Sequence, residues 1–128
     1  MIYMYTATFI TEDDYVYARV PDLPGCISSG HTLDEAIDLI TDAASVWLVS
    51  AEDDGDSIPA ASNQSDLDIP KGAIVSLIRI DTIAYRAATD TKAVRKNVSL
   101  PAWMANLADK RGINCSQLLQ DSLLAKLS

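Results

Sequence analysis

The chain has 128 residues, of which 48% are hydrophobic and 22% are charged. This composition is that of a globular chain with one domain, or with a small domain and an appendage, and it excludes a disordered protein. No apolar run is long enough to span a bilayer, no basic and apolar leader opens the chain, and two cysteines cannot form a disulfide framework. We therefore expect a protein of the reducing cytoplasm.

The net charge of −8 conceals two segments of opposite sign. Residues 1–70 carry fourteen acidic residues and a single base, Arg19, for a net charge of −13. Residues 71–128 carry nine bases and four acids, for a net charge of +5. Opposite fields indicate two different partners, one basic and one acidic. The alternative is that the charge only keeps each part soluble.

The first part of the chain has the pattern of a small sheet covered by one helix. Aromatic and β-branched residues predict strands at residues 3–10, 15–20 and 73–80, and residues 26–29 predict a further short strand. The short interval after the first strand predicts a hairpin. The prolines of 21–25 end the second strand, and Gly30 closes the third. Residues 73–80 are apolar enough to lie inside a sheet.

One amphipathic helix is predicted over residues 33–50, because apolar residues recur there at helical spacing. Thr32 and Glu35 form a capping-box pattern at its start. Glu35, Asp38 and Asp42 lie off the apolar stripe, either as a solvated face or as a surface for a basic partner. Residues 52–70 are acidic and aperiodic and predict a loop, and residues 84–91 are a connector without a strong pattern.

The last 37 residues, 92–128, have a different pattern. Residues 95–100 alternate and predict a strand, with Val98 and Leu100 on one side and the polar residues on the other: Arg95, Asn97 and Ser99. Pro101 suits the first turn of a helix that Gly112 ends. Asn114 opens a second helix with Gln117 three residues later.

This segment is too small to fold alone, since a piece of fewer than about 40 residues usually needs a staple or a partner. Its single strand also has no pairing partner in the segment. Pairing with a second copy across a two-fold axis meets both needs. We expect the dimer core to contain the apolar residues of the strand and the two helices: Val98, Leu100, Trp103, Leu107, Leu119 and Leu123.

The order of strand, helix, glycine turn and helix resembles the ribbon–helix–helix family of DNA-binding repressors. The resemblance is carried by residues 95–101, by residues 112–117 and by the leucines after them. It implies an antiparallel ribbon in the major groove, with Arg95, Asn97 and Ser99 facing base edges, which suits the hydrogen-bonding chemistry of these side chains. It also implies a phosphate at the start of the second helix, held by Asn114, Cys115 and Ser116.

Residues 18–26 and 30–36 resemble the HicB antitoxin family, and residues 55–59 fit its exit from the helix. The resemblance implies an α+β protein with three parts. These are a β-β-β-α-β domain of partial ribonuclease H-like fold at 1–83, a connector at 84–91 and a ribbon–helix–helix domain at 92–128.

The same resemblance implies a function. The protein would be an antitoxin that binds a HicA-type toxin, which is a small basic ribonuclease that cleaves mRNA, and it would repress its own operon by binding operator DNA. The acidic residues Glu35, Asp38 and Asp42 are the candidate toxin-binding surface. A homodimer through the tail is expected, within a larger heteromeric complex where the toxin is present.

No residue pattern indicates catalysis. His31, the single histidine, lies before a helix cap, and no nucleophile can be placed beside it. Cys26 and Cys115 lack the spacing of a metal site, and the strands at 3–10 and 15–20 carry no acids for a ribonuclease H metal centre. We expect no catalytic residue, metal, cofactor or enzyme activity. Two alternatives remain: an active ribonuclease H-like nuclease, and a repressor whose first domain senses a small molecule.

Overall fold

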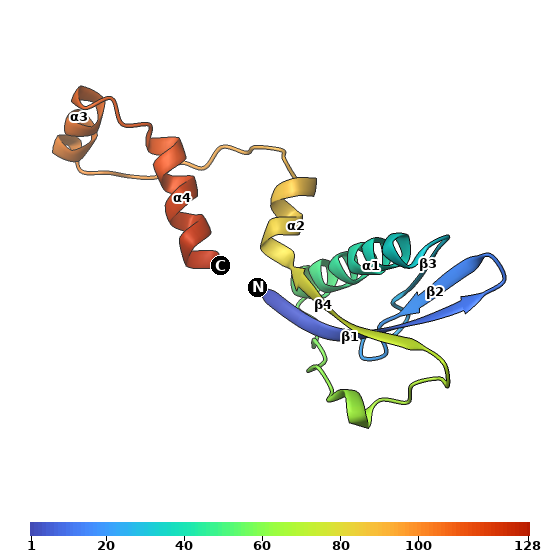
Figure 1. The fold of residues 1–128 in the computed structure, drawn as a ribbon. Helices are drawn as coiled ribbons and strands as arrows, with labels where there is room; N and C mark the ends of the chain where they lie inside the picture. The colour runs from blue at the N-terminus through green and yellow to red at the C-terminus, as the bar shows by residue number, and fades with distance from the viewer.

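The computed structural model describes all 128 residues and contains one four-stranded antiparallel sheet (Figure 1). Its strands stand in the order β3-β2-β1-β4. They are β1 (Ile2–Glu12), β2 (Tyr15–Arg19), β3 (Ile27–Gly30) and β4 (Ile74–Asp81). The first three strands and the predicted hairpin are confirmed within a residue or two at each end. The predicted α+β class is confirmed as well.

The helix that covers the sheet is α1 (Leu33–Asp54). The Thr32 hydroxyl caps it by accepting from the Glu35 amide at 3.2 Å, as the capping-box pattern predicts. The helix runs four residues beyond the predicted end and stops at Gly55, whose φ of 70° suits a left-handed C-cap. Gly30 lets β3 approach this helix closely, because a Cβ there would lie 2.8 Å from the Ala36 nitrogen.

The core lies between α1 and one face of the sheet. Tyr5 and Phe9 of β1 and Ile80 of β4 pack with Ile40 and Leu48 of α1, and each is at most 2% exposed. These residues alternate along the strands and recur at helical spacing along α1, so both periodicities in the sequence point into one core. Burial of apolar side chains of this size contributes about 1.5–3 kcal/mol each.

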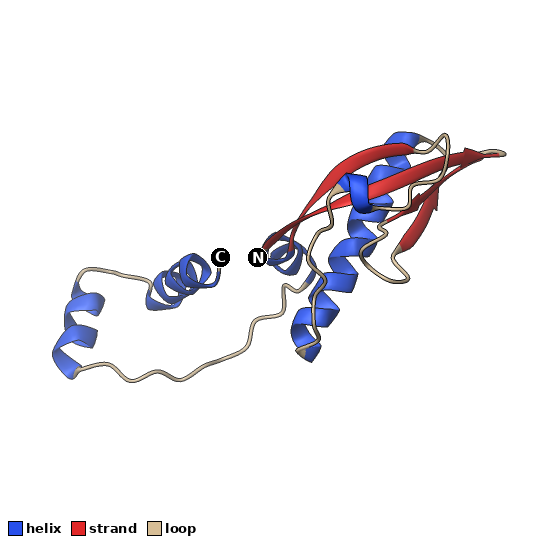
Figure 2. Cartoon of the chain, turned by 90° about the horizontal axis from the view of Figure 1, so that it is seen from below, coloured by secondary structure: helices blue, strands red, loops and turns tan.

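The opposite face of the sheet is partly covered by the segment between α1 and β4, which contains the short helix η1 (Gln64–Asp66) (Figure 2). Asp22 anchors this loop: the Ser62 amide donates to one carboxylate oxygen at 2.8 Å and the Ser62 hydroxyl to the other at 2.7 Å. Thr6 and Thr8 are buried although they alternate with the core residues of β1. The loop, held at Ser62 by Asp22, therefore covers part of this face.

Strand β4 is the outer strand of the sheet, next to β1 alone. The interpretation of residues 73–80 as a strand inside the sheet is therefore wrong about position. Its apolar composition comes from Ile78 and Ile80, which face α1 and are buried, and from Ile74 and Leu77, which are exposed.

Helix α2 (Thr82–Thr89) occupies the segment that the sequence suggested to be a patternless connector. Tertiary contacts stabilise it: Arg86 bridges Glu52 at 3.2 Å and Asp53 at 2.9 Å at the end of α1. The Tyr3 hydroxyl donates to the other oxygen of the Glu52 carboxylate at 2.9 Å, and buried Thr82 approaches that oxygen at 3.1 Å. An eight-residue helix gains its stability from such packing, which its own sequence does not show.

The last two helices, α3 (Ala102–Lys110) and α4 (Cys115–Leu127), stand away from the sheet (Figure 1). Gly112, with a φ of 65°, turns the chain between them as predicted. Residues 90–101 have no regular structure, so the predicted strand at 95–100 is not formed in the single chain. A strand needs a ladder partner, and the single chain offers none. None of the helices combines the length and the apolar character needed to cross a membrane.

The cluster of Glu52 with Tyr3, Thr82 and Arg86 should make the free energy of unfolding depend on pH. Burial by itself would raise the pKa of Glu52, but hydrogen bonds from Tyr3, Arg86 and Thr82 and the charge of Arg86 lower it overall. The carboxylate therefore stabilises the fold fully above its ordinary pKa of 4.5, and this contribution is lost as the pH falls through the lowered value. We expect Glu52→Gln to reduce the free energy of unfolding by about 1–2 kcal/mol at pH 7.

Urea unfolding between pH 3 and pH 7 measures this effect. The difference between the natural protein and Glu52→Gln should shrink towards acid pH. Asp54→Asn is the matched control, because Asp54 lies two residues further along the same helix and is exposed. A difference that stays constant over the whole range would show that the charge of Glu52 contributes nothing.

Candidate functional site

The tail (residues 92–128) carries the predicted DNA-binding residues in an open arrangement. Arg95, Asn97 and Ser99 are all exposed in the extended segment before α3. None of the three side chains makes a hydrogen bond or an ion pair within the chain. The structure therefore places the three residues along one short segment without building a finished reading surface.

The apolar side chains of the tail are exposed as well. Trp103 is 63% exposed and Leu127 66%, and no residue of the tail is buried. A groove of about 620 Å³ runs between residues 96–100, α3 and α4. Five of the six predicted dimer-core residues line it: Val98, Leu100, Trp103, Leu107 and Leu119. Leu123, the sixth, is 46% exposed. A continuous apolar surface of this kind marks an interaction site.

The start of α4 has the features of an anion-binding helix terminus. The Asn114 side chain caps it by accepting from the Gln117 amide at 3.0 Å, as predicted. Cys115 and Ser116 supply the first-turn N–H groups, which have no carbonyl partner inside a helix and lie at the positive end of its dipole. The predicted phosphate contacts are therefore brought together at one exposed point.

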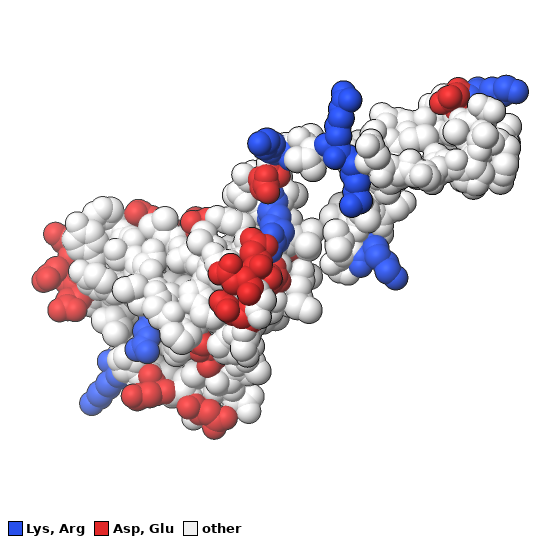
Figure 3. Space-filling model, turned by 180° about the vertical axis from the view of Figure 1, so that it is seen from behind, with Lys and Arg blue, Asp and Glu red and all other residues white.

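Acidic residues gather on the sheet unit (residues 1–89), while basic residues follow the extended segment before α3 and the helices of the tail (Figure 3). Glu35, Asp38 and Asp42 are exposed on α1, opposite its buried residues. Their spacing places them on one side of the helix, as the sequence predicted. The structure thus shows an exposed acidic side of α1, built by the packing of the other side against the sheet.

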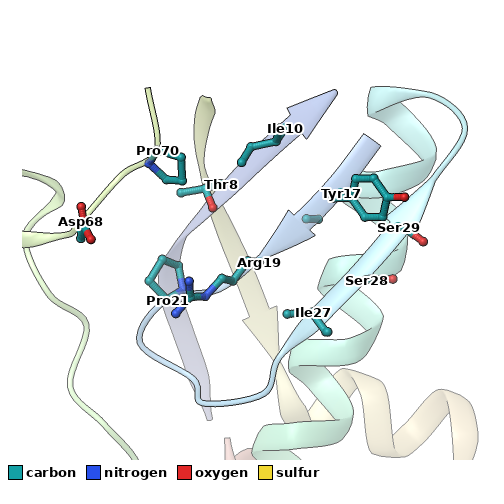
Figure 4. Close-up of a pocket in the computed structure, with 11 residues that line it drawn as sticks. Thr8, Ile10, Tyr17, Arg19, Pro21, Ile27, Ser28, Ser29, Asp68 and Pro70 are labelled. Carbon is teal, nitrogen blue, oxygen red and sulfur yellow. The ribbon is translucent and has the colours of Figure 1, made fainter. Parts of the chain in front are cut away.

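The open face of the sheet also holds a recess of about 430 Å³, which the sequence did not predict (Figure 4). Thr8, Arg19 and Ile27 stand side by side on three strands, as the strand register dictates. Asp68 and Pro70 of the loop line its rim. The alternation of residues 15–19 along β2 was the available signal, but the loop that completes the recess lies about 50 residues further along the chain.

The single histidine and the two cysteines do not come together as one group in the structure. No cluster of three or more His, Cys, Asp or Glu residues is close enough to hold a metal ion. The ring of His31 packs against that of Tyr15 at an angle of 35°, with ring centroids 4.8 Å apart. Cys26 is buried, and burial raises the pKa of its thiol. Burial and the Glu52 carboxylate raise the pKa of Tyr3 to about 12, within the structural cluster that holds α2.

Comparison with known proteins decides the family. The sequence profile of the HicB-like antitoxins of bacterial toxin–antitoxin systems matches residues 5–128. The chain belongs to the HicB-like antitoxin family. This antitoxin is 30% identical over 104 residues to a protein of Haemophilus phage HP1, described as an uncharacterized 14.9 kDa protein in the rep-hol intergenic region. That match covers 77% of this chain and 72% of the phage protein.

Solved structures show the same fold for this HicB-like antitoxin. A chain of a toxin–antitoxin complex from Streptococcus pneumoniae matches with a TM-score of 0.62 and 18% identity, over 98% of this chain and 99% of that chain. The antitoxin HicB of Burkholderia pseudomallei matches with a TM-score of 0.57 and 24% identity, over the same shares of the two chains. A chain of the HicA3 and HicB3 complex matches 62% of this chain and 99% of its own, at a TM-score of 0.51 and 20% identity.

Proposed function

We propose that this HicB-like antitoxin neutralises a HicA-type toxin with its sheet unit and represses its own operon with a dimeric ribbon–helix–helix tail. The observation that carries the proposal is that one chain joins an acidic sheet unit to a basic tail in which no apolar side chain is buried. The division is a toxin-binding domain at 1–83, a connector at 84–91 and a DNA-binding domain at 92–128. The toxin–antitoxin complexes among the structural relatives support the toxin as partner.

The tail becomes a DNA-binding module when two copies pair. Residues 95–100 of two chains then form an antiparallel ribbon, which supplies the ladder that the single chain lacks. Val98 and Leu100 face the groove between the helices, where the other exposed leucines close the core. Burial of this surface drives association, and folding of the tail depends on it.

In the dimer, the polar side of the ribbon reads operator DNA. Arg95 offers a bidentate donor pair for guanine, Asn97 a donor and an acceptor for adenine, and Ser99 a weaker contact to either base. The N–H groups at the start of α4, at Cys115 and Ser116 beside the Asn114 cap, hold a backbone phosphate and fix the register of the protein on the duplex.

The acidic side of α1 receives the basic toxin. Glu35, Asp38 and Asp42 present negative charge from a rigid helix, and the field of residues 1–70 attracts a cationic protein over longer distances. The recess on the other face is less suited to a basic partner because Arg19 lines it.

The proposed activity is binding alone, without a metal or cofactor, in the cytoplasm where the toxin acts. We also propose that the sheet unit is a truncated ribonuclease H-like fold that has no nuclease chemistry. The strands at 3–10 and 15–20 supply no carboxylates to the sheet surface where such an enzyme would hold metal ions.

The dimer interface can be tested by trimming its core. Val98→Ala should weaken dimerisation by about 1 kcal/mol or more per protomer, because the ribbon core loses two methyl groups on each side. Sedimentation of the full chain measures the dissociation constant. Val46→Ala, at an exposed position of α1, is the matched control and should leave it unchanged. A natural protein that sediments at 13.8 kDa, the mass of one chain, at micromolar concentration would contradict the dimer.

The reading residues can be tested by the ratio of operator to scrambled-DNA affinity at fixed salt. Arg95→Ala and Asn97→Ala should each lower this ratio, since every lost bidentate pair costs about 1–3 kcal/mol and a dimer loses it twice. Weak, salt-sensitive background binding should persist. Asn106→Ala, an exposed asparagine of α3, is the control. An unchanged ratio for both variants would remove the ribbon as the reader.

The toxin surface can be tested by reversing its charge. The double variant Asp38→Lys and Asp42→Lys should slow association with the toxin encoded beside this protein by about ten-fold at low salt, with a smaller effect at high salt. Glu12→Lys with Asp14→Lys makes the same change in net charge on the β1–β2 hairpin and serves as the control. Equal effects of the two double variants would refute a local role for α1.

A further inference from the structure

The outer side of β4 is an unpaired strand edge. β4 is the last strand of the sheet, and its ladder with β1 is continuous from Ile74 to Asp81. Apart from that ladder, no main-chain hydrogen bond involves residues 74–81. Alternate N–H and C=O groups along this strand therefore point outward without a main-chain partner on a further strand. Among them, the Leu77 carbonyl accepts a hydrogen bond from the neighbouring Ser76 hydroxyl at 3.2 Å.

The two edges of this sheet differ in how they are protected. β3 has four residues, follows Pro24 and Gly25, and ends against the first turn of α1. β4 has twice that length, contains no proline or bulge, and exposes 49% of Ile74 and 62% of Leu77. Long, flat, apolar edges pair with another strand unless proteins block them. The central-strand composition of residues 73–80 fits an edge that is covered in the assembled protein.

Local charge favours a second copy of this chain over a basic partner. Lys71 lies just before this strand and Arg79 lies within it. Both would repel the cationic protein that the rest of the sheet unit attracts. A second β4 that runs antiparallel with Ser76 opposite the partner's Ser76 places Val75 opposite the partner's Leu77 and Ile74 opposite the partner's Ile78. Apolar pairs across adjacent strands are stabilising, and in this register the two Arg79 side chains do not face each other.

We propose that the outer edge of β4 pairs with β4 of a second copy across a two-fold axis at Ser76, so that two sheets become one. This contact lies on the sheet unit, outside the tail groove and the acidic side of α1. It goes beyond the proposed function and does not rest on it. The isologous pairing supplies each strand with the ladder that it lacks.

Cross-linking of the full chain tests the proposal. Ser76→Cys in a Cys115→Ser background leaves buried Cys26 as the one other thiol. Mild oxidation should yield a covalent dimer, because residue 76 lies opposite its own copy on the axis. Ile27→Cys in the same background is the control. Ile27 is 67% exposed on the opposite edge of the sheet, so it reports any cross-linking that comes only from dimerisation of the tail.

A charged side chain introduced at the proposed interface provides a second test of the β4 pairing. Leu77→Lys, added to the Ser76→Cys protein, should abolish most of the cross-link, since each apolar pair of Leu77 with the partner's Val75 is replaced by a charge against an apolar side chain, and the two lysines lie diagonally across the axis. Met4→Lys should not, because Met4 is also exposed but lies one strand inside the edge. Both side chains are exposed, so neither change disturbs the core. Equal yields at positions 76 and 27, or a yield at 76 that Leu77→Lys leaves unchanged, would overturn the proposal.

Discussion

Packing of α1 against one face of the sheet is the interaction on which the functional surfaces of the sheet unit depend. Ile40 and Leu48 are fully buried there, and this fixes the rotation of the helix about its axis. The acidic residues must then face solvent, on the side away from the sheet. The same packing brings Glu52, near the end of the helix, to Tyr3 and Arg86. The direction in which the chain leaves the sheet unit is therefore set by the core.

The tail, unlike the sheet unit, has no buried core of its own. It has too few residues to bury its own apolar side chains, and in the proposed function its folding free energy comes from association. Under that proposal, stability of the tail and its affinity for DNA would depend on protein concentration through the same equilibrium. The sheet unit would then bind toxin as a monomer, and the tail would bind DNA only once enough of the protein has accumulated.

Periodicity predicted the parts of the fold that a single segment determines. The apolar stripe of α1 and the alternation of β1 and β2 are properties of consecutive residues, and they lie where the sequence placed them. The features it missed depend on distant partners. Helix α2 needs Glu52 and Asp53 to hold Arg86, the recess needs Pro70 from a remote loop, and the edge position of β4 depends on strand order. The strand at 95–100, which the alternation of residues predicted, is not formed in the single chain.

If the chain self-associates both through the tail and through β4, each contact would strengthen the other, because residues 90–94 connect the two surfaces. Once residues 95–100 enter a ribbon, about five residues remain between α2 and the ribbon, and these span at most about 17 Å. Such a short tether holds two sheet units at an effective concentration of about millimolar, at which even a weak edge contact between β4 strands is occupied. The net charge of −13 in residues 1–70 opposes this approach, and a bound basic toxin removes part of that charge. Toxin binding on α1 and sheet pairing at β4 would then be coupled through electrostatics, although the two surfaces lie on different elements of the fold.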